Sequence, residues 1–143
     1  MLVFGALFLL ASPLLAADAA EEAKKAETAF AKAFADRDQE AFFALVADDA
    51  HFIGPKRILS GKGEVREVWS KFFADARAPF SWSPERVVAN AAGDIALSTG
   101  PIRDPAGNHI GDFSSVWRRQ PDGSWKVIFD GPGSQVCATA EPK

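Results

Sequence analysis

The first third of the chain alternates apolar and polar positions with the period of a helix. In residues 21–37, small or apolar side chains recur at spacings of three and four, while charged side chains fill the positions between them. The recurring residues are Ala26, Ala29, Phe30, Ala33 and Phe34. Because this spacing places them on one face, the segment is predicted to form an amphipathic helix.

Two shorter helices are predicted after it. Asp38 precedes a short apolar run, and its carboxylate can accept a hydrogen bond from an amide of a first helical turn. After Ser60, apolar side chains again fall on one side over residues 65–73. The short extended segments 51–54 and 57–59 lie between these two helices and are bounded by glycine-containing turns.

After the third helix, four segments are rich in β-branched and aromatic residues, as strands are. They are residues 80–89, 94–102, 109–119 and 125–129, and short separators that contain glycine join them. Such separators predict antiparallel hairpins, and Pro84 within the first segment indicates an edge position or a bulge. Helices followed by a meander predict an α+β fold with the helices packed on one face of a curved sheet.

Length and composition indicate a single globular domain. With 143 residues, the chain has the length of one ordinary domain. Its 48% hydrophobic and 24% charged residues are typical of a globular protein rather than of a disordered one. The net charge is -3, and no basic stripe exists to neutralise a phosphate backbone, so nucleic acid is not an expected partner.

The chain begins with a segment that has the order of a secretory signal peptide, "MLVFGALFLLASPLLAADAA". Its apolar run at residues 2–10 is too short to span a bilayer and is followed by Pro13 and small residues. No lysine or arginine precedes the run, so an uncleaved membrane anchor and a misassigned start codon are the alternatives. We expect residues 1–19 to be removed, which leaves a periplasmic or secreted protein without stable membrane insertion.

The domain is expected to occupy residues 20–134, followed at 135–143 by a polar tail that is predicted to be disordered. Cys137 in this tail is the only cysteine of the chain, so no internal disulfide is possible. A catalytic thiolate needs a positioned base and a shaped pocket. We therefore interpret Cys137 as a loose thiol.

The order helix, helix, short strand, helix and long meander resembles the nuclear transport factor 2-like superfamily. Three segments show the similarity, "FADRDQEAFFALVADDAHFIGPKRILSGKGEVREVW", "AAGDIALSTG" and "SSVWRRQPDGSWKVIFD". Over residues 21–134 the chain resembles the family named domain of unknown function 4440, which is close to the SnoaL-like domains. The last segment is the most specific, because its strand end, Pro-Asp-Gly turn and returning strand recur together in that family.

This resemblance implies a cone-shaped curved antiparallel sheet wrapped around three N-terminal-side helices, a fold also called cystatin-like. It further implies a pocket inside the cone and frequent homodimers that form through the outer face of the sheet. It does not imply one activity, because the superfamily includes isomerases, dehydratases, epoxide hydrolases and oligomerisation domains. Function must therefore be argued from the residues of the pocket.

The best understood enzyme of this shape is ketosteroid isomerase. It uses a carboxylate base on its first strand and an oxyanion hole made by a tyrosine and a protonated aspartate. The position of the base, immediately before Pro55, is Gly54 in this chain. The chain contains no tyrosine, and the position of the second acid falls near Ser115. The comparison therefore argues against steroid isomerisation by that mechanism.

Asp48, Asp49 and His51 have the composition of a metal site, but their spacing gives a poor geometry. On an extended segment Asp49 and His51 share a face that Asp48 does not, and His109 lies on a distant hairpin. We interpret the two aspartates as the solvated end of the second helix and His51 as the start of the first strand. No metal and no other cofactor are expected.

Asp130 ends the last strand, directly after an apolar run. In relatives of this shape, that end of the strand approaches the pocket. An inward-facing carboxyl among aromatic side chains would have a raised pKa and could act as a general acid or base. The alternative is a turn residue that caps backbone amides of the Gly-Pro-Gly sequence after it.

Twelve phenylalanines and four tryptophans make the predicted interior aromatic. We assign nine inward-facing side chains to the predicted ligand-binding pocket. They are Phe30, Phe34, Phe52, Trp69, Phe73, Phe113, Ser115, Trp117 and Asp130. The alternative is that the rings among them are plain core, which is the commoner role of aromatic side chains at such spacings.

Three functions fit these features. The first is an exported protein that binds an apolar or mixed small molecule in a cone-shaped pocket. The second is an enzyme of the isomerase, dehydratase or hydrolase type, with Asp130 as general acid or base. The third is an oligomerisation or interaction module whose interior is filled by its own aromatic side chains. A one-residue change of strand register would exchange the assigned strand residues for neighbours on the other face.

Overall fold

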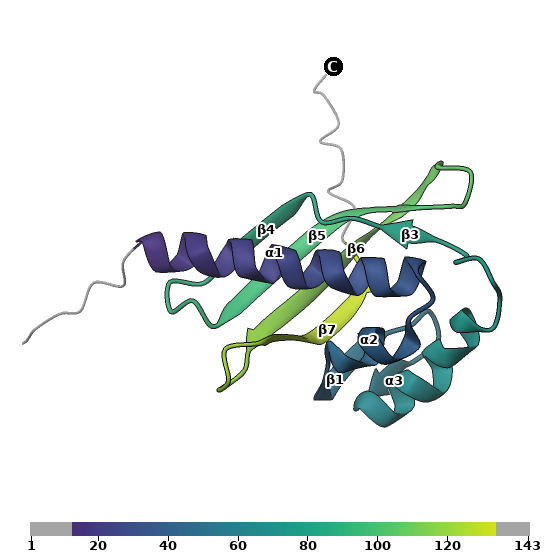
Figure 1. The fold of residues 1–143 in the computed structure, drawn as a ribbon, viewed down its shortest axis with the longest axis horizontal. Coiled ribbons are helices and arrows are strands. Elements are labelled where there is room, and N and C mark those ends of the chain that lie inside the picture. Colours follow the sequence, from purple (N-terminus) through teal and green to yellow (C-terminus); the bar gives the residue numbers. More distant parts are fainter. Residues whose placement is uncertain (1–12, 134–143) are drawn as a thin grey trace, which may run out of the picture.

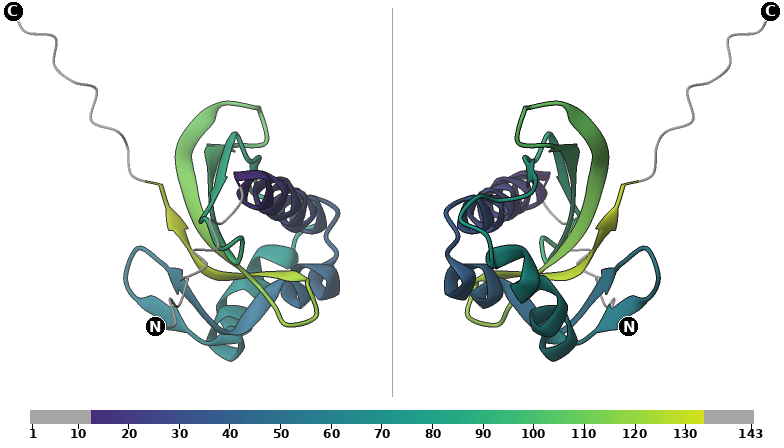
Figure 2. Two further views of the ribbon diagram at one scale, coloured as in Figure 1. Left: turned by 90° about the vertical axis from the view of Figure 1, so that its left-hand side faces the viewer. Right: turned by 90° about the vertical axis from the view of Figure 1, so that its right-hand side faces the viewer.

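A long first helix lies along one face of a curved sheet, and two shorter helices lie near one end of that sheet (Figure 1). The computed structural model describes residues 13–133. The strands curl around the first helix, which therefore lies on the concave side of the sheet (Figure 2). The elements, in chain order, are α1 (Pro13–Ala35), α2 (Gln39–Ala44), β1 (Val46–Ile53), β2 (Ile58–Ser60), α3 (Lys62–Trp69), the 3-10 helix η1 (Ser70–Phe73), β3 (Ser81–Trp82), β4 (Arg86–Ala89), β5 (Ile95–Arg103), β6 (His109–Arg119) and β7 (Trp125–Pro132).

The sheet has the strand order β2-β1-β7-β6-β5-β3, and β4 pairs with β5 beside β3. Strands β5, β6 and β7 form the antiparallel meander that the turn residues predict. Strand β1 pairs with β7 in parallel, which no local sequence pattern reveals. The predicted α+β fold, with a curved sheet around N-terminal-side helices, is confirmed, and its sheet is mixed rather than wholly antiparallel.

The predicted start of the second helix is confirmed. The Oδ1 atom of Asp38 accepts a hydrogen bond from the amide of Ala41 at 2.9 Å, which satisfies a free donor of the first turn of α2. Arg37, the residue before the cap, has a φ of 65°. This left-handed conformation turns the chain sharply between α1 and α2, so that the two helices pack against each other.

Pro84 divides the first predicted strand of the meander into β3 and β4. Both halves pair with β5, with Ser81 opposite Arg103 and Arg86 opposite Thr99. Because proline cannot donate a ladder hydrogen bond, the break falls at this residue, on the free side of β5. The prediction of an edge position is therefore confirmed.

The prediction that Asp48 and Asp49 lie at the end of the second helix is wrong. That helix ends at Ala44, and both aspartates belong to β1. The pairing between β1 and β7 shifts in register between Val46 and His51, and this irregularity leaves the two consecutive aspartates exposed. Their predicted contact with solvent is confirmed, although they reach it from a strand.

Aromatic rings fill the space between α1, the shorter helices and the sheet. Phe30 and Phe34 on α1 are completely buried. Phe30 stacks on Phe42 of α2 with ring centroids 4.2 Å apart, and Phe34 stacks on Phe80 at 4.9 Å. The apolar face of the first helix is therefore the centre of the core, as its spacing predicts.

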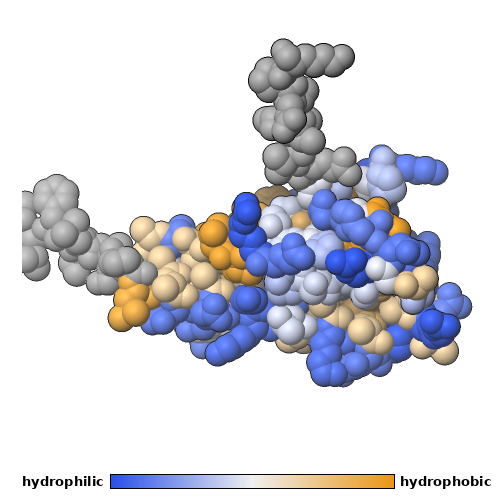
Figure 3. Space-filling view, turned by 90° about the horizontal axis from the view of Figure 1, so that it is seen from above, coloured by the Kyte–Doolittle hydropathy of each residue, from blue (hydrophilic) through white to orange (hydrophobic). Residues whose placement is uncertain are grey.

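The start of α1 exposes an apolar surface, seen at the left of Figure 3. Leu14 there is 69% exposed, whereas Ala19 is completely buried. Helix α1 continues unbroken through the predicted cleavage region. None of the described helices is long and apolar enough to cross a membrane. Residues 1–12 and 134–143 lie outside the described residues, and with them most of the predicted signal peptide, the predicted disordered tail and Cys137.

We expect Gly100→Ala to destabilise the fold. A Cβ atom at this position of β5 would collide with the carbonyl oxygen of Ser83 and would lie 3.1 Å from Cε1 of Phe113. Because the first obstacle is backbone, the free energy of unfolding should fall by roughly 1–3 kcal/mol or more. Urea unfolding measures this change.

The matched control is Gly111→Ala on β6, because a Cβ atom there meets nothing within 4 Å. Its free energy of unfolding should stay within about 0.5 kcal/mol of the unchanged protein. Equal losses in the two variants would show that the close approach of Ser83 to β5 does not limit residue 100.

Candidate functional site

One transverse row on the inner face of the sheet is polar at its centre. Strand register places Val87, Ser98, Ser115, Asp130 and Phe52 side by side on β4, β5, β6, β7 and β1. Ser98 and Ser115 are completely buried, and Asp130 is half-buried. Side chains that lie opposite one another in register share a face, so these three polar groups all point toward α1.

Glu27 on α1 lies above this row and is completely buried. Its Oε1 atom accepts a hydrogen bond from Nε1 of Trp82 at 2.8 Å, and its Oε2 atom accepts one from Nε1 of Trp117 at 2.7 Å. The hydroxyl of Ser115 also donates to Oε2. We call these four residues the Glu27 cluster. Its three donors orient the carboxylate firmly.

Glu27 is not among the site residues predicted from the sequence. The signal was nevertheless present, because Glu27 lies four residues after Ala23 and three before Phe30, on the buried face of α1. A carboxylate on the apolar face of a helix must find hydrogen-bond donors or lose stability. Its donors come from β3 and β6, which the pattern of α1 cannot reveal.

Asp130 lies on β7 between Ser115 and Phe52, on the inner face of the sheet. None of the described hydrogen bonds joins its carboxylate to the backbone of residues 131–133, as the turn-capping alternative would require. Burial among protein atoms raises the pKa of Asp130 well above its ordinary value, and the negative charge of Glu27 raises it further. A carboxyl in this environment can hold a proton that an exposed aspartate would lose.

The aromatic residues assigned to the predicted pocket lie together in the structure. Phe30, Phe34, Phe52, Phe113 and Trp117 are buried, and Trp69 and Phe73 are half-buried. Many of these rings contact one another, as Phe52 and Trp69 do at 5.3 Å between centroids. The structure thus brings six of these seven rings into one core cluster, with Phe113 outside it at 6.5 Å from the ring of Trp82. Ligand contact by these side chains stays a prediction.

Ser98 is the one buried side chain among the described residues whose oxygen has no hydrogen-bond partner. It lies opposite Ser115, within the polar row. A buried hydroxyl without a partner costs about 1–3 kcal/mol. Such a group is more easily explained next to a site that admits a polar molecule than inside a closed core.

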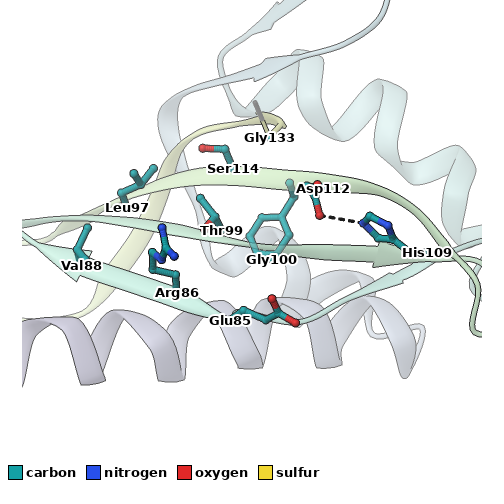
Figure 4. Close-up of a pocket in the computed structure, with 11 residues that line it drawn as sticks. Glu85, Arg86, Val88, Leu97, Thr99, Gly100, His109, Asp112, Ser114 and Gly133 are labelled. Atoms are coloured by element: carbon teal, nitrogen blue, oxygen red, sulfur yellow. Dashed lines mark hydrogen bonds and ion pairs between the residues drawn. The ribbon is translucent and has the colours of Figure 1, made fainter. Parts of the chain in front are cut away.

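The face of the sheet away from α1 carries a groove of about 810 Å³ (Figure 4). Val88, Leu97 and Ser114 line it from β4, β5 and β6. Nε2 of His109 lies 2.9 Å from Oδ1 of Asp112 at one end, an ion pair when the histidine is protonated. Of the residues assigned to the predicted pocket, Phe113 alone also lines this groove.

The acidic pair on β1 and His51 have separate partners. Asp49 accepts two hydrogen bonds from the guanidinium of Arg118, at 2.7 and 2.9 Å, and this pairing lowers the pKa of Asp49. Nδ1 of His51 lies 3.2 Å from Oγ of Ser60. Within residues 13–133 no group of three side chains is placed to hold a metal ion.

The profile of the SnoaL-like domain matches residues 24–130, so this chain belongs to the SnoaL-like family. The resemblance to the SnoaL-like and nuclear transport factor 2-like proteins is thereby confirmed, although the matching profile is not that of domain of unknown function 4440. No protein of curated function matches the chain.

Solved structures with the same fold include proteins of several descriptions. A nuclear transport factor 2-like protein of unknown function from Pseudomonas putida KT2440 has 23% sequence identity and a TM-score of 0.66, over 83% of this chain and 88% of its own. A ketosteroid isomerase-like protein from Erwinia carotovora atroseptica SCRI1043 has 24% identity and a TM-score of 0.60, over 81% and 97%.

A protein from Streptomyces avermitilis, described as a proposed dehydratase of the nuclear transport factor 2-like family, has 25% identity and a TM-score of 0.62. The match covers 84% of this chain and 99% of that protein. At such identities these structures establish the fold, and the chemistry must come from this chain's own residues.

We expect the stability of the protein to fall as the pH rises through the native pKa of Asp130. That pKa lies above the value of about 4 for an unfolded aspartate, so the native state binds more protons between the two values. Each unit of difference costs about 1.4 kcal/mol of unfolding free energy once both states are ionised. Urea unfolding at a series of pH values measures the slope.

In Asp130→Asn this contribution is absent, so the variant should lose less stability over the same pH range and exceed the unchanged protein at its upper end. Asp48→Asn is the matched control, because the side chain of Asp48 is 96% exposed. It should keep the original slope. The assignment of Asp130 as a protonated buried acid fails if both variants show the same pH dependence.

Proposed function

We propose that this chain is an exported enzyme that binds a small organic molecule on the inner face of its sheet and uses Asp130 as general acid or base. The observation that supports this proposal most directly is the inward carboxyl of Asp130, which has no hydrogen-bond partner within residues 13–133. A carboxyl whose pKa is raised well above its ordinary value holds a proton over a wider pH range and can act as an acid as well as a base.

Phe52 lies beside Asp130, and the ring of Trp69 contacts Phe52, so the surroundings suit an apolar or mixed substrate. In the proposed reaction, protonated Asp130 donates its proton to a carbonyl or hydroxyl oxygen of the substrate. The carboxylate that results accepts a proton from a neighbouring carbon, so the residue returns to its starting form. Such proton transfer is the common step of isomerases and dehydratases, the two activities suggested by the descriptions of the similar structures.

Admission of a substrate requires some rings of the core to move. Phe80 and Trp82 are half-buried, whereas Phe30 and Phe34 beneath them are completely buried. Trp82 lies on β3, a strand of two residues. The segment before this strand, which carries Phe80, is therefore the part of the aromatic cluster that can open while Trp82 keeps its hydrogen bond to Glu27.

Deuterium exchange tests this function without knowledge of the natural substrate. The protein is incubated in deuterated buffer with a panel of neutral aryl and alicyclic ketones, and loss of the protons next to the carbonyl is followed by proton NMR. Exchange catalysed by the protein should fall by about 10²-fold or more in Asp130→Asn. Asp48→Asn should exchange at the original rate, because Asp48 faces solvent.

Retention of full exchange by Asp130→Asn would exclude Asp130 as the acid or base. If no ketone exchanges its protons, but several ketones shift the backbone amide signals of the polar row, the chain is a binding protein. That is the first of the three functions predicted from its sequence.

A second role, homodimerisation, is favoured by the outer face of the sheet. One residue along from the polar row, register aligns Val88, Leu97, Val116, Phe129 and His51 on that face. Val88, Leu97 and Phe129 are 52%, 41% and 46% exposed. A contiguous exposed apolar row of this kind marks an interaction surface, and a second copy of the same row would cover it.

Export is supported by the exposed leucines at the start of α1. Leu14 and Leu15 are large apolar side chains that are exposed in this structure. Removal of residues 1–19 would remove both, at the loss of the buried contacts of Ala19. The apolar surface at this end of the molecule would then be absent from the mature protein.

Native mass spectrometry of the protein purified from its own cells tests export and dimerisation together. The expected species is a dimer of chains that lack residues 1–19. Leu97→Lys should shift the population to monomers, because it buries a charge in the proposed interface, whereas Leu97→Met should remain dimeric. A monomer for the unchanged protein would contradict the interface, and a full-length chain mass would contradict cleavage.

A further inference from the structure

Two glutamates of α1 accept hydrogen bonds from indole groups, but only one of them pairs with a cation. Oε2 of Glu22 accepts a bond from Nε1 of Trp125 at 2.9 Å and lies 2.7 Å from Nη2 of Arg119. Glu27 accepts bonds from two indoles and a hydroxyl, and none of the described salt bridges includes it. Glu22 is half-exposed and compensated, while Glu27 is buried with its charge uncompensated.

An uncompensated buried charge is not needed to hold the fold together. The oxygen of an amide side chain accepts hydrogen bonds from indole and hydroxyl donors as a carboxylate does, without the cost of burying a charge. The negative charge of Glu27 is therefore the feature that packing does not explain. Groups of this kind occur preferentially where they act on a neighbouring group.

The neighbour on which this charge acts is Asp130. Ser115 lies opposite Asp130 across β6 and β7, and its single hydroxyl proton is donated to Glu27. Ser115 therefore has only acceptor capacity left, and Nε1 of Trp117 already lies 3.0 Å from its Oγ atom. The nearest polar side chain in the row thus offers Asp130 an acceptor and no proton, which suits a protonated carboxyl.

The remaining surroundings of Asp130 do not offset this effect. Strand β1 presents Phe52 beside it, β6 presents Ser115, and α1 presents Glu27. Among the described residues, Glu27 is the only charged group that shifts the titration of Asp130. No basic side chain in the described part of the chain stabilises its ionised form.

We propose that Glu27 is a positioning residue of the candidate site, whose fixed carboxylate takes the Ser115 hydroxyl proton and so leaves Asp130 beside an acceptor and a negative charge. This inference rests on the proposed role of Asp130 as acid or base, because an acid must hold a proton before it can donate one. Trp82 and Trp117 serve the same role one step further away, because they fix the carboxylate in place.

The titration of Asp130 in the substrate-free protein tests the proposal. The carboxyl carbon of Asp130 is followed by NMR over pH in protein labelled with ¹³C aspartate. In Glu27→Gln the midpoint should move down toward the ordinary range of an aspartate. Glu22→Gln is the matched control on the same helix, and it should leave the Asp130 midpoint unchanged while it shifts the indole signal of Trp125 alone.

The unchanged protein gives a second test that no folding defect can obscure. When Asp130 ionises, the indole signals of Trp82 and Trp117 should shift with the same midpoint, because both donate to the carboxylate beside it. The indole signal of Trp125 should not follow that midpoint. The proposal is overturned if the indole signals of Trp82 and Trp117 do not shift when Asp130 ionises. It is also overturned if a folded Glu27→Gln protein has the same Asp130 midpoint as the unchanged protein.

These measurements need no substrate, so they separate the two proposals. A lowered midpoint in Glu27→Gln, without ketone exchange by the unchanged protein, would support the coupling and count against the enzyme. If exchange occurs, its rate should decrease as the pH rises, and this decrease should begin at a lower pH in Glu27→Gln than in the unchanged protein. The reason is that the required acid, Asp130, loses its proton at a lower pH in the variant. An unaltered pH profile would overturn the positioning role.

Discussion

The carboxylate of Glu27 joins three parts of the fold at one buried point. It belongs to α1, and its donors belong to the edge strand β3 and the central strand β6. Hydrogen bonds to a charged acceptor are strong in a low-dielectric interior, and a missing partner there is correspondingly costly. The position of α1 over the sheet, and hence the packing of its phenylalanines, depends on this set of bonds.

The sheet reverses the usual distribution of polarity over one pair of neighbouring rows. An antiparallel sheet with one covered face ordinarily presents apolar side chains inward and polar ones outward. Here the inward row contains Ser98, Ser115 and Asp130, and the outward row beside it contains Val88, Leu97 and Phe129. The next inward row, Ala96, Trp117 and Val127, is apolar and buried, and it supplies the conventional core. The buried polar groups of the sheet are thus confined to one inward row.

The sequence predicts the elements that have a clear local period and misses those that depend on distant pairing. The helix of residues 21–37 and the strands of the meander follow from periods of 3.6 and 2. The first strand is longer than its pattern suggests, because the irregular register around Asp48 and Asp49 removes the alternation. Its parallel pairing with β7 has no local signal at all. The parity of Ser115 and Trp117 along one strand was sufficient to place both inward.

The candidate site was only half visible for the same reason. Asp130 could be identified because it follows a buried strand, but its direction depends on pairing with both β1 and β6. The sequence shows Glu27 as a charged residue on an apolar helix face, but the residues near it in the chain do not predict its hydrogen-bond partners. The features that distinguish this chain from ketosteroid isomerase are Gly54 and the lack of tyrosine, and both are evident from the sequence alone.

The spacing of the Glu27 cluster along the chain has a consequence for the order of folding. Glu27 lies 88 and 90 residues before Ser115 and Trp117, its partners on β6. During synthesis, the carboxylate on the apolar face of α1 therefore lacks its hydrogen-bond donors until most of the domain has been made. Contacts so distant in sequence form slowly, since the intervening chain must first lose its freedom. Until then the helix cannot bury that face without cost, and the nascent chain remains open for longer than one whose core closes locally.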